Sequence, residues 1–450
     1  MAAMAWAGAV PAQEAAGPED IATILAQRID RDGQGVGLAA AIVSDGTPQI
    51  ATHGVLAAGG TAPVTPDTLF EIGSITKVFT NLLLAQLVLE GRMALDRPVA
   101  DYLPAGTAVP RFGDRQITLF DLATHHSGLP AVPPEMMFAD PADPYAAYSA
   151  EMLMRSLGAY DLVEAPGTRF AYSNTGAALL GLAVSHVAGA PYAELVETRI
   201  LDVLGMEDTM LVVPPAEAAR FATGHDVNGD AAGHWDFDVF AAAGGYRSTV
   251  GDMAKFVAAA SGRTETGLAA AFALMLERTR PAGGPGVSIG LGWMITETPR
   301  GRIVWHNGIT GGFNAFAGYA DTGGRGAVVL ANRVSAGGIE DIGFHLIDPD
   351  LPLRPPPSAR ESVEIDPAAL RDYVGTYRLA PDFALSVTES GGRLFAQATG
   401  QARFELFAEG GDRFFYRVVD ARLSFTRDAA GAVDGLVLHQ NGRDVPGRRE

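Results

Sequence analysis

The chain has 450 residues, of which 48% are hydrophobic, so it can bury the core of one large domain or of two smaller ones. Its formal net charge of −19 excludes a strongly basic surface and argues against nucleic acid or an anionic membrane as the main partner. Because the sequence contains no cysteine, disulfides, zinc–thiolate sites and thiol nucleophiles are excluded together.

Residues 1–18 form a run of small apolar residues that contains the letters AVPA, which resembles the end of a secretory signal and its cleavage site. A basic segment at the start of such a signal is missing, so a plain disordered tail is the alternative. We expect a periplasmic or secreted protein. We expect no integral membrane segment, because the apolar run 82–89 is bounded by Lys77 and Glu90.

The elements that follow predict one α/β domain over residues 19–349. Apolar spacing predicts a helix over 19–31, and two extended runs flank the turn dipeptide Asp45-Gly46. A long apolar helix is expected before Gly91, and 95–245 reads as a mostly helical lobe of helices and loops. Extended runs at 288–296, 302–308, 314–322 and 326–333 suit an antiparallel meander. Strands at both ends of the domain predict a central antiparallel sheet flanked by helices.

The last part of the chain predicts a separate small domain. Residues 350–365 are rich in proline and polar residues, which is typical of a linker. Over 366–450, short strand-like runs recur about every ten residues between glycine-containing turns. This pattern predicts a small all-β domain, either a sandwich or a barrel.

Ser74 and Lys77 lie three residues apart at the predicted start of a helix, so their side chains share one face. A serine hydroxyl becomes a strong nucleophile when a base removes its proton, and a lysine kept neutral by burial can be that base. The helix N-terminus also favours an oxyanion beside Ser74. The alternative is a capping serine followed by a surface lysine, and the chain has only two lysines, Lys77 and Lys255.

Two further segments carry candidate site residues. Tyr172 and Asn174 alternate with Ser173, so in an extended segment they point the same way. A tyrosine can pass a proton to a leaving group, and an amide can hold both a lysine and a substrate carbonyl. The strand-like run ending at His306 and Gly308 precedes a glycine-rich turn, which lets a backbone N–H approach a substrate.

Together these motifs resemble the penicillin-recognising serine hydrolases, specifically their class C β-lactamase-like branch, which includes family VIII carboxylesterases and D-aminopeptidases. Five stretches resemble that family in the expected order over about 20–345: LFEIGSITKVFT, ITLFDLATHHSGLP, PGTRFAYSNTGAALLG, AAGGYRSTVGDMAKF and GLGWMI. The C-terminal domain resembles the lipocalin-like β domains that are appended to such hydrolases.

The resemblance implies a role for each motif residue. Ser74 would be the acylated nucleophile, Lys77 its base, and Tyr172 the group that exchanges a proton with the leaving group. Asn174 would orient the substrate and Lys77. The resemblance also implies an oxyanion hole formed by the backbone N–H groups of Ser74 and Ile309, with His306 and Gly308 lining the third wall.

One departure from the family directs the choice of substrate. True class C β-lactamases usually have Lys-Thr-Gly where this chain has His306-Asn307-Gly308, and a histidine near neutral pH is a weaker, pH-dependent cation. Within the family, His306-x-Gly308 resembles the carboxylesterases and D-amino-acid peptidases more than dedicated β-lactamases, and this resemblance implies hydrolysis of an ester or a D-amino-acid peptide. The alternatives are a β-lactamase proper and a penicillin-binding protein that holds peptidoglycan peptide without catalysis.

No cofactor and no metal site is expected. The pair His125-His126 is an unsuitable metal site because adjacent side chains diverge on an extended segment. Residues 226–230 read as a solvated turn, since Ala231 stands where a calcium loop needs glycine. Glu164 is close to Tyr172 in sequence, but no pattern assigns it a catalytic role.

Overall fold

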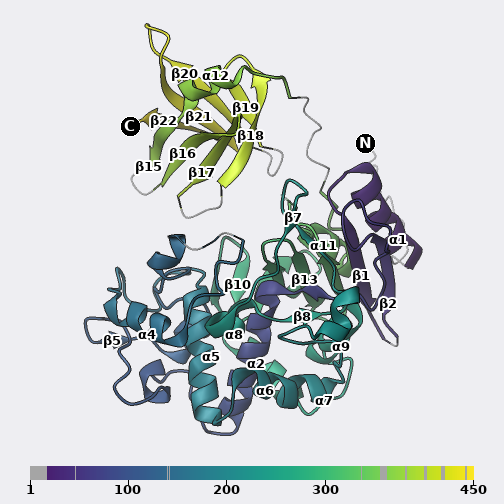
Figure 1. Ribbon diagram of the computed structural model, residues 1–450. Helices are drawn as coiled ribbons and strands as arrows, with labels where there is room; N and C mark the ends of the chain where they lie inside the picture. The colour runs from purple at the N-terminus through teal and green to yellow at the C-terminus, as the bar shows by residue number, and fades with distance from the viewer. Residues whose placement is uncertain are drawn as a thin grey trace, which may run out of the picture. The chain divides into compact units, whose positions relative to one another are not determined.

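The computed structural model describes residues 18–450, except 46, 139, 141, 336, 355–361, 381–382, 400–402, 417–420 and 441–442 (Figure 1). Contacts divide the chain into two compact units, Met1–Leu353 and Arg354–Glu450. The predicted signal-like segment lies outside the described residues, except for residue 18, and so does much of the predicted linker.

The first unit contains an antiparallel sheet of eight strands that come from both ends of the unit, as predicted. Two strands precede residue 55 and six follow residue 279. In spatial order they are β2 (Gln49–Gly54), β1 (Gly37–Val43), β14 (Gly326–Ala331), β13 (Asn314–Ala320), β12 (Gly301–Ile309), β11 (Met294–Thr298), β10 (Val287–Ile289) and β9 (Arg280–Pro281).

Helices cover both faces of this sheet. Strand β1 is buried throughout, and its alternate residues belong to different apolar clusters. Leu38 packs in the cluster that includes residues of α1 (Pro18–Ala26) and α11 (Glu340–Ile347), whereas Ala39 packs in the cluster that includes α9 (Val250–Ala260). A strand covered on both sides needs a continuous apolar run, which the letters GLAAAIV supply.

The region between β2 and β9 is mostly helical, as expected. Helices α2 (Thr76–Leu89), α5 (Asn174–Ala188) and α8 (Ala241–Gly244) lie side by side at its centre (Figure 1). Ser173 caps the N-terminus of α5, and Gly189, in the left-handed conformation, ends it. The other α-helices of this region are α3 (Leu119–Ala123), α4 (Ala150–Ala159), α6 (Tyr192–Val196), α7 (Asp202–Leu204), α9 (Val250–Ala260) and α10 (Ala269–Glu277).

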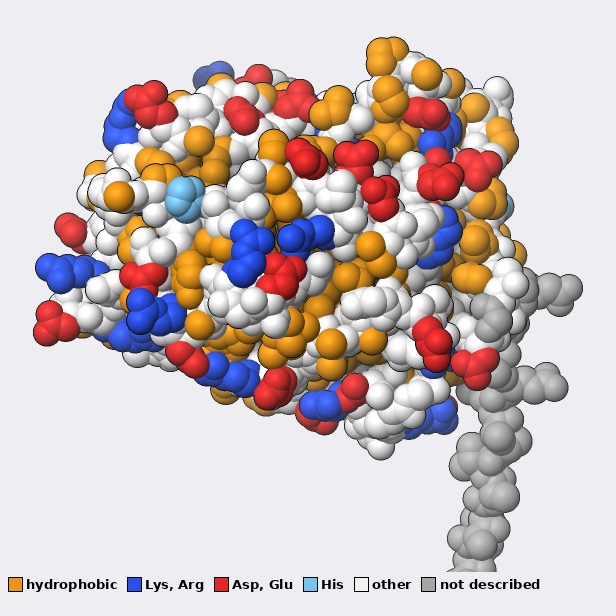
Figure 2. Space-filling model, turned by 90° about the horizontal axis from the view of Figure 1, so that it is seen from below, with side chains coloured by type: hydrophobic (Ala, Val, Ile, Leu, Met, Phe, Trp, Pro, Cys, Tyr) orange, Lys and Arg blue, Asp and Glu red, His pale blue; other side chains and the backbone are white. Residues whose placement is uncertain are grey.

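Among the described residues, no single helix has both the length and the apolar character to cross a bilayer. A pair of described segments bent by 78°, Asn174–Ala188 and Tyr192–Leu204, meets that test when the two are taken together. Figure 2 shows Lys and Arg side chains interspersed with Asp and Glu over the face seen from below.

One predicted strand is divided in the structure. The run 288–296 forms β10 and β11, which are joined by a turn at Gly290–Trp293. Gly292 has φ +75°, and a Cβ atom at Gly290 would lie 2.3 Å from the carbonyl oxygen of Met275. The glycines therefore let the chain reverse tightly against α10, which the apolar pattern alone did not indicate.

The second unit is a closed eight-stranded barrel, which settles the choice between sandwich and barrel. The rings of Tyr373, Phe414 and Phe425 pack together, with centroid separations of 4.8–5.5 Å. The short helix α12 (Pro367–Leu370) is followed by β15 (Gly375–Ala380), β16 (Phe383–Ser390), β17 (Arg393–Ala398), β18 (Arg403–Gly410), β19 (Arg413–Phe415), β20 (Ala421–Arg427), β21 (Val433–Gln440) and β22 (Arg443–Arg449). Pairing of β15 with β22 closes the barrel and removes its open edges.

Candidate active site

Ser74 lies in a single 3₁₀ turn, Gly73–Ile75, between the short strand β3 (Phe70–Glu71) and helix α2. Strand β3 pairs with β8 (Arg247–Ser248), which fixes the chain just before the turn. Gly73 has φ +49°, a conformation that favours glycine. The local sequence therefore places Ser74 at the N-terminus of a long apolar helix, where partial positive charge gathers.

Lys77 is buried one turn after Ser74, with an exposed fraction of only 1%. Its Nζ donates hydrogen bonds to Ser74 Oγ at 2.9 Å and to the carbonyl oxygen of Ala243 at 2.6 Å. Burial lowers the pKa of Lys77 well below its ordinary value, because the charged form loses its hydration. A neutral amine at hydrogen-bonding distance can accept the proton of the serine hydroxyl.

Tyr172 contacts both of these residues. Its ring centroid lies 4.8 Å from Lys77 Nζ. Desolvation raises the pKa of Tyr172, and the neighbouring Ser74 hydroxyl opposes that rise in part. The residue is nevertheless 36% exposed, so a substrate can reach the ring. Tyr172 is therefore a protonated phenol beside the serine hydroxyl and can donate its proton.

Asn174 is the first residue of helix α5, and Ser173 before it is fully buried and caps the helix. The Asn174 amide donates to the hydroxyl of Tyr145 at 2.9 Å, and its Oδ1 is buried with no partner among the described residues. Lys77 donates its second hydrogen bond to the carbonyl oxygen of Ala243 and not to Asn174, contrary to the role that the resemblance implied for Asn174. Tyr145 joins the site through a contact that no spacing in the sequence signals.

His306 is a neutral imidazole, which corrects the expectation of a pH-dependent cation. Burial lowers the pKa of His306 to about 3, and the neighbouring Lys77 contributes to the shift. Nδ1 lies 2.6 Å from the carbonyl oxygen of Asn307 and so carries the proton, because a carbonyl can only accept. Nε2 has no partner among the described residues, and the ring lies 6.4 Å from that of Tyr172. It is therefore a buried hydrogen-bond acceptor.

Gly308 and Ile309 bring strand β12 directly against the turn that carries Ser74. A Cβ atom at Gly308 would lie 1.9 Å from the carbonyl oxygen of Ile72 and 3.1 Å from the amide nitrogen of Ser74. A Cβ atom at Gly73 would lie 2.9 Å from the amide nitrogen of Ile309. The two amides that the resemblance assigns to an oxyanion hole thus belong to segments in close contact.

A buried ion pair between Glu71 and Arg247 stabilises the segment that carries Ser74. Glu71 accepts hydrogen bonds from Arg247 at 3.3 Å and from the backbone N–H of Trp235 at 3.1 Å. Arg247 also donates to the carbonyl oxygen of Gly245 at 2.9 Å. The pair therefore joins strand β3, before Ser74, to the segment that begins with Ala243. Removing one partner of such a pair costs about 3–5 kcal/mol, because a buried charge is left uncompensated.

The other candidates from the sequence have structural partners. His125 Nδ1 accepts a hydrogen bond from the backbone N–H of Ser173 at 3.2 Å, and His126 Nδ1 contacts the carbonyl oxygen of Thr124. Glu164 forms an ion pair with Arg169. Within 226–230, the side chain of the first residue accepts hydrogen bonds from the backbone N–H groups of 228 and 230, as in a polar turn.

The comparisons agree with this geometry. The Beta-lactamase family matches residues 21–348, and the Domain of unknown function (DUF3471) matches residues 359–449. The chain is 28% identical to a beta-lactamase of Pseudomonas fluorescens, over 66% of this chain and 88% of that protein. It is 29% identical to the D-alanyl-D-alanine-carboxypeptidase/endopeptidase AmpH of Escherichia coli (strain K12), over 67% of this chain and 80% of that protein.

Among solved structures, a class C beta lactamase from Rhodobacter sphaeroides is 28% identical. It superposes with a TM-score of 0.60 over 70% of this chain and 94% of the other. The family match spans well over half of the chain. This chain therefore belongs to the β-lactamase family of serine hydrolases.

Proposed function

We propose that this protein cleaves an ester or amide bond through an acyl-enzyme on Ser74, with Lys77 as the base. The observation that carries the proposal is the 2.9 Å contact between the buried amine of Lys77 and the serine hydroxyl. Burial lowers the pKa of Lys77 well below its ordinary value, which favours the neutral amine that a base requires. The N-terminus of α2 and the adjoining strand β12 support the same assignment, because both place backbone N–H groups beside Ser74.

The reaction would begin with attack of Ser74 Oγ on the substrate carbonyl carbon while Lys77 accepts the hydroxyl proton. The carbonyl oxygen, now negatively charged, would lie between the amides of Ser74 and Ile309. Breakage of the bond to the leaving group would follow, with Tyr172 donating a proton to it and recovering one from Lys77. Water would then release the acyl group by the same proton transfers in reverse.

The substrate we favour is an ester or a D-amino-acid peptide that lacks a carboxylate beside the scissile bond, as for a carboxylesterase or D-amino-acid peptidase. Support comes from His306, whose neutral ring offers a lone pair at Nε2 where a dedicated β-lactamase offers a cation. A lone pair binds a hydroxyl or N–H group of the substrate and repels a carboxylate. β-Lactamase activity is the second candidate, supported by the two relatives that are named as β-lactamases.

A binding protein without catalysis is the remaining alternative. It would retain the fold but would have no need of the contacts among Ser74, Lys77 and Tyr172, which together supply a complete route for the proton. A periplasmic or secreted location, where peptidoglycan peptides and β-lactams are met, remains part of the proposal.

The test is intact-mass analysis after exposure to a penicillin, a cephalosporin, short p-nitrophenyl esters and D-alanyl peptides. We expect a covalent adduct with the ester or the peptide that forms and decays in the wild type and is absent in Ser74→Ala. Ser261→Ala, which changes a serine at the end of α9, is the matched control and should react like the wild type. An adduct in Ser74→Ala would place the nucleophile elsewhere, and binding without any adduct would favour the non-catalytic alternative.

A further inference from the structure

The ring of His125 lies against the ring of Tyr172, with centroids 4.2 Å apart and planes inclined by 36°. His125 follows helix α3 and is buried, with an exposed fraction of 3%. Its φ is +55°, in the left-handed region that few residues other than glycine occupy. A backbone held in such a conformation costs about 1–3 kcal/mol and persists only where surrounding contacts impose it.

Hydrogen bonds from both sides of Tyr172 go to the segment that begins at His125. The backbone N–H of Ala171 donates to the His125 carbonyl oxygen at 2.8 Å, and that of Ser173 donates to His125 Nδ1 at 3.2 Å. The backbone N–H of Asn174 donates to the carbonyl oxygen of Ala131 at 2.8 Å. Because Nδ1 accepts, the imidazole proton is on Nε2, and burial keeps the pKa of His125 low enough for the ring to stay neutral.

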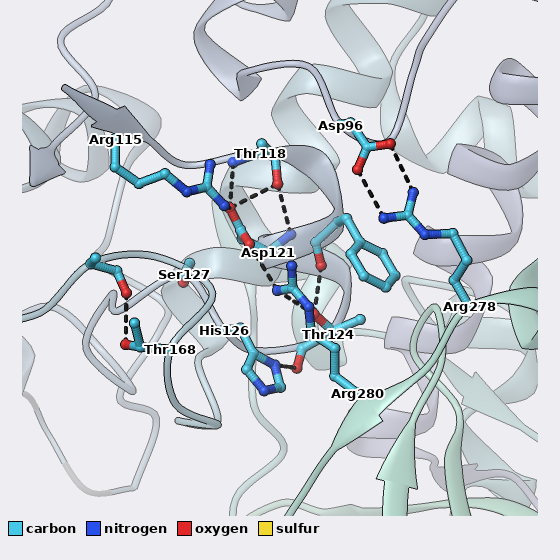
Figure 3. Close-up of polar contacts among 12 residues, drawn as sticks. Asp96, Arg115, Thr118, Asp121, Thr124, His126, Ser127, Thr168, Arg278 and Arg280 are labelled. Carbon is cyan, nitrogen blue, oxygen red and sulfur yellow. Dashed lines mark hydrogen bonds and ion pairs between the residues drawn. The ribbon is translucent and has the colours of Figure 1, made fainter.

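The position of His125 is fixed in turn by the end of helix α3. The backbone N–H of His126 donates to the carbonyl oxygen of Asp121 at 2.7 Å. The fully buried carboxylate of Asp121 forms ion pairs of 2.8 Å with Arg115 and with Arg280 of the edge strand β9 (Figure 3). The segment after α3 is therefore anchored to the central sheet before it reaches Tyr172.

We propose that His125 is a positioning residue that holds the Tyr172 hydroxyl toward Ser74. The ring of His125 sets the tilt of the Tyr172 ring, and its Nδ1 fixes the backbone on the far side of Tyr172. The inference rests on the proposed function of Tyr172 in proton transfer. His125 acts through Tyr172 and has no assigned contact with the substrate.

The test combines His125→Asn with Tyr172→Phe in the full chain. Asparagine tolerates the left-handed backbone and retains an acceptor, but it removes the ring. We expect kcat for a p-nitrophenyl ester to fall at least about 10-fold in His125→Asn with KM within about twofold, since a 1 Å misplacement costs about 100-fold. In the Tyr172→Phe background the same substitution should have no further effect, because the group it positions is already missing.

His126→Gln is the matched control, since it changes the adjacent buried histidine, whose ring contacts Phe170 and not Tyr172. It should retain kcat within about twofold. A second measurement is independent of catalysis: with 3-fluorotyrosine incorporated, the ¹⁹F resonance absent from Tyr172→Phe identifies Tyr172. That resonance should shift or broaden in His125→Asn and stay in place in His126→Gln.

Additive effects of His125→Asn and Tyr172→Phe would overturn the inference, and so would an unchanged Tyr172 resonance in His125→Asn. If the wild type forms no adduct at Ser74, the proposed function fails, and the ¹⁹F measurement alone still decides whether His125 positions Tyr172.

Discussion

Replacing Gly308 with alanine should remove most activity without preventing folding of the first unit. The added Cβ atom would lie 1.9 Å from the carbonyl oxygen of Ile72, whereas such contacts in proteins are essentially never shorter than 3.0 Å. Strand β12 and the turn carrying Ser74 must therefore separate by about 1 Å. Because both proposed oxyanion donors lie at this contact, we expect kcat/KM to fall about 100-fold, or about 2.7 kcal/mol of transition-state stabilisation.

The assay is steady-state hydrolysis of a p-nitrophenyl ester, with thermal unfolding followed by circular dichroism on the same samples. Gly267→Ala is the matched control, because a Cβ atom there meets no atom within 4 Å and its φ is not in the left-handed region. This control should keep both activity and melting temperature. Wild-type kcat/KM in Gly308→Ala would refute the assignment of an oxyanion site to the contact between β12 and the Ser74 turn.

Two further predictions concern the charges in the site. Lys77 must be neutral to accept a proton, so kcat/KM should rise as Lys77 of the free enzyme loses its proton, at a pH well below the ordinary lysine value of 10.5. The raised pKa of Tyr172 should delay any decline until the pH exceeds 10.0. A profile with no rise between about pH 5 and pH 10 would contradict the role of Lys77, and a decline that begins below pH 10.0 would contradict that of Tyr172. Substituting His306→Lys should favour carboxylate-bearing penicillin over a neutral ester by about 10-fold, the value of a 1.4 kcal/mol interaction. His306→Gln, which stays neutral, should leave that preference unchanged, and an equal ratio in both variants would show that this position does not select the substrate.

Much of the candidate site could be predicted from the sequence because several of its residues are close neighbours along the chain. Ser74 and Lys77 share a face since one helical turn separates them. The alternation about Ser173 predicts that Tyr172 and Asn174 point the same way. The same local periodicities predicted the central sheet, the helical region and the β-rich second unit. These features depend on neighbours along the chain, so the order of residues is enough to indicate them.

Only the tertiary structure decided which groups the site residues contact and whether each site residue carries a charge. The carbonyl oxygen that binds Lys77 belongs to Ala243, which is 166 residues away in the chain. The ring that packs on Tyr172 belongs to His125, which lies in the loop after helix α3. His306 is an acceptor and not a cation because elements distant in sequence exclude water from it, and hydration is what stabilises an imidazolium. Burial is a property of the assembled fold, and so the charge of each site residue is too.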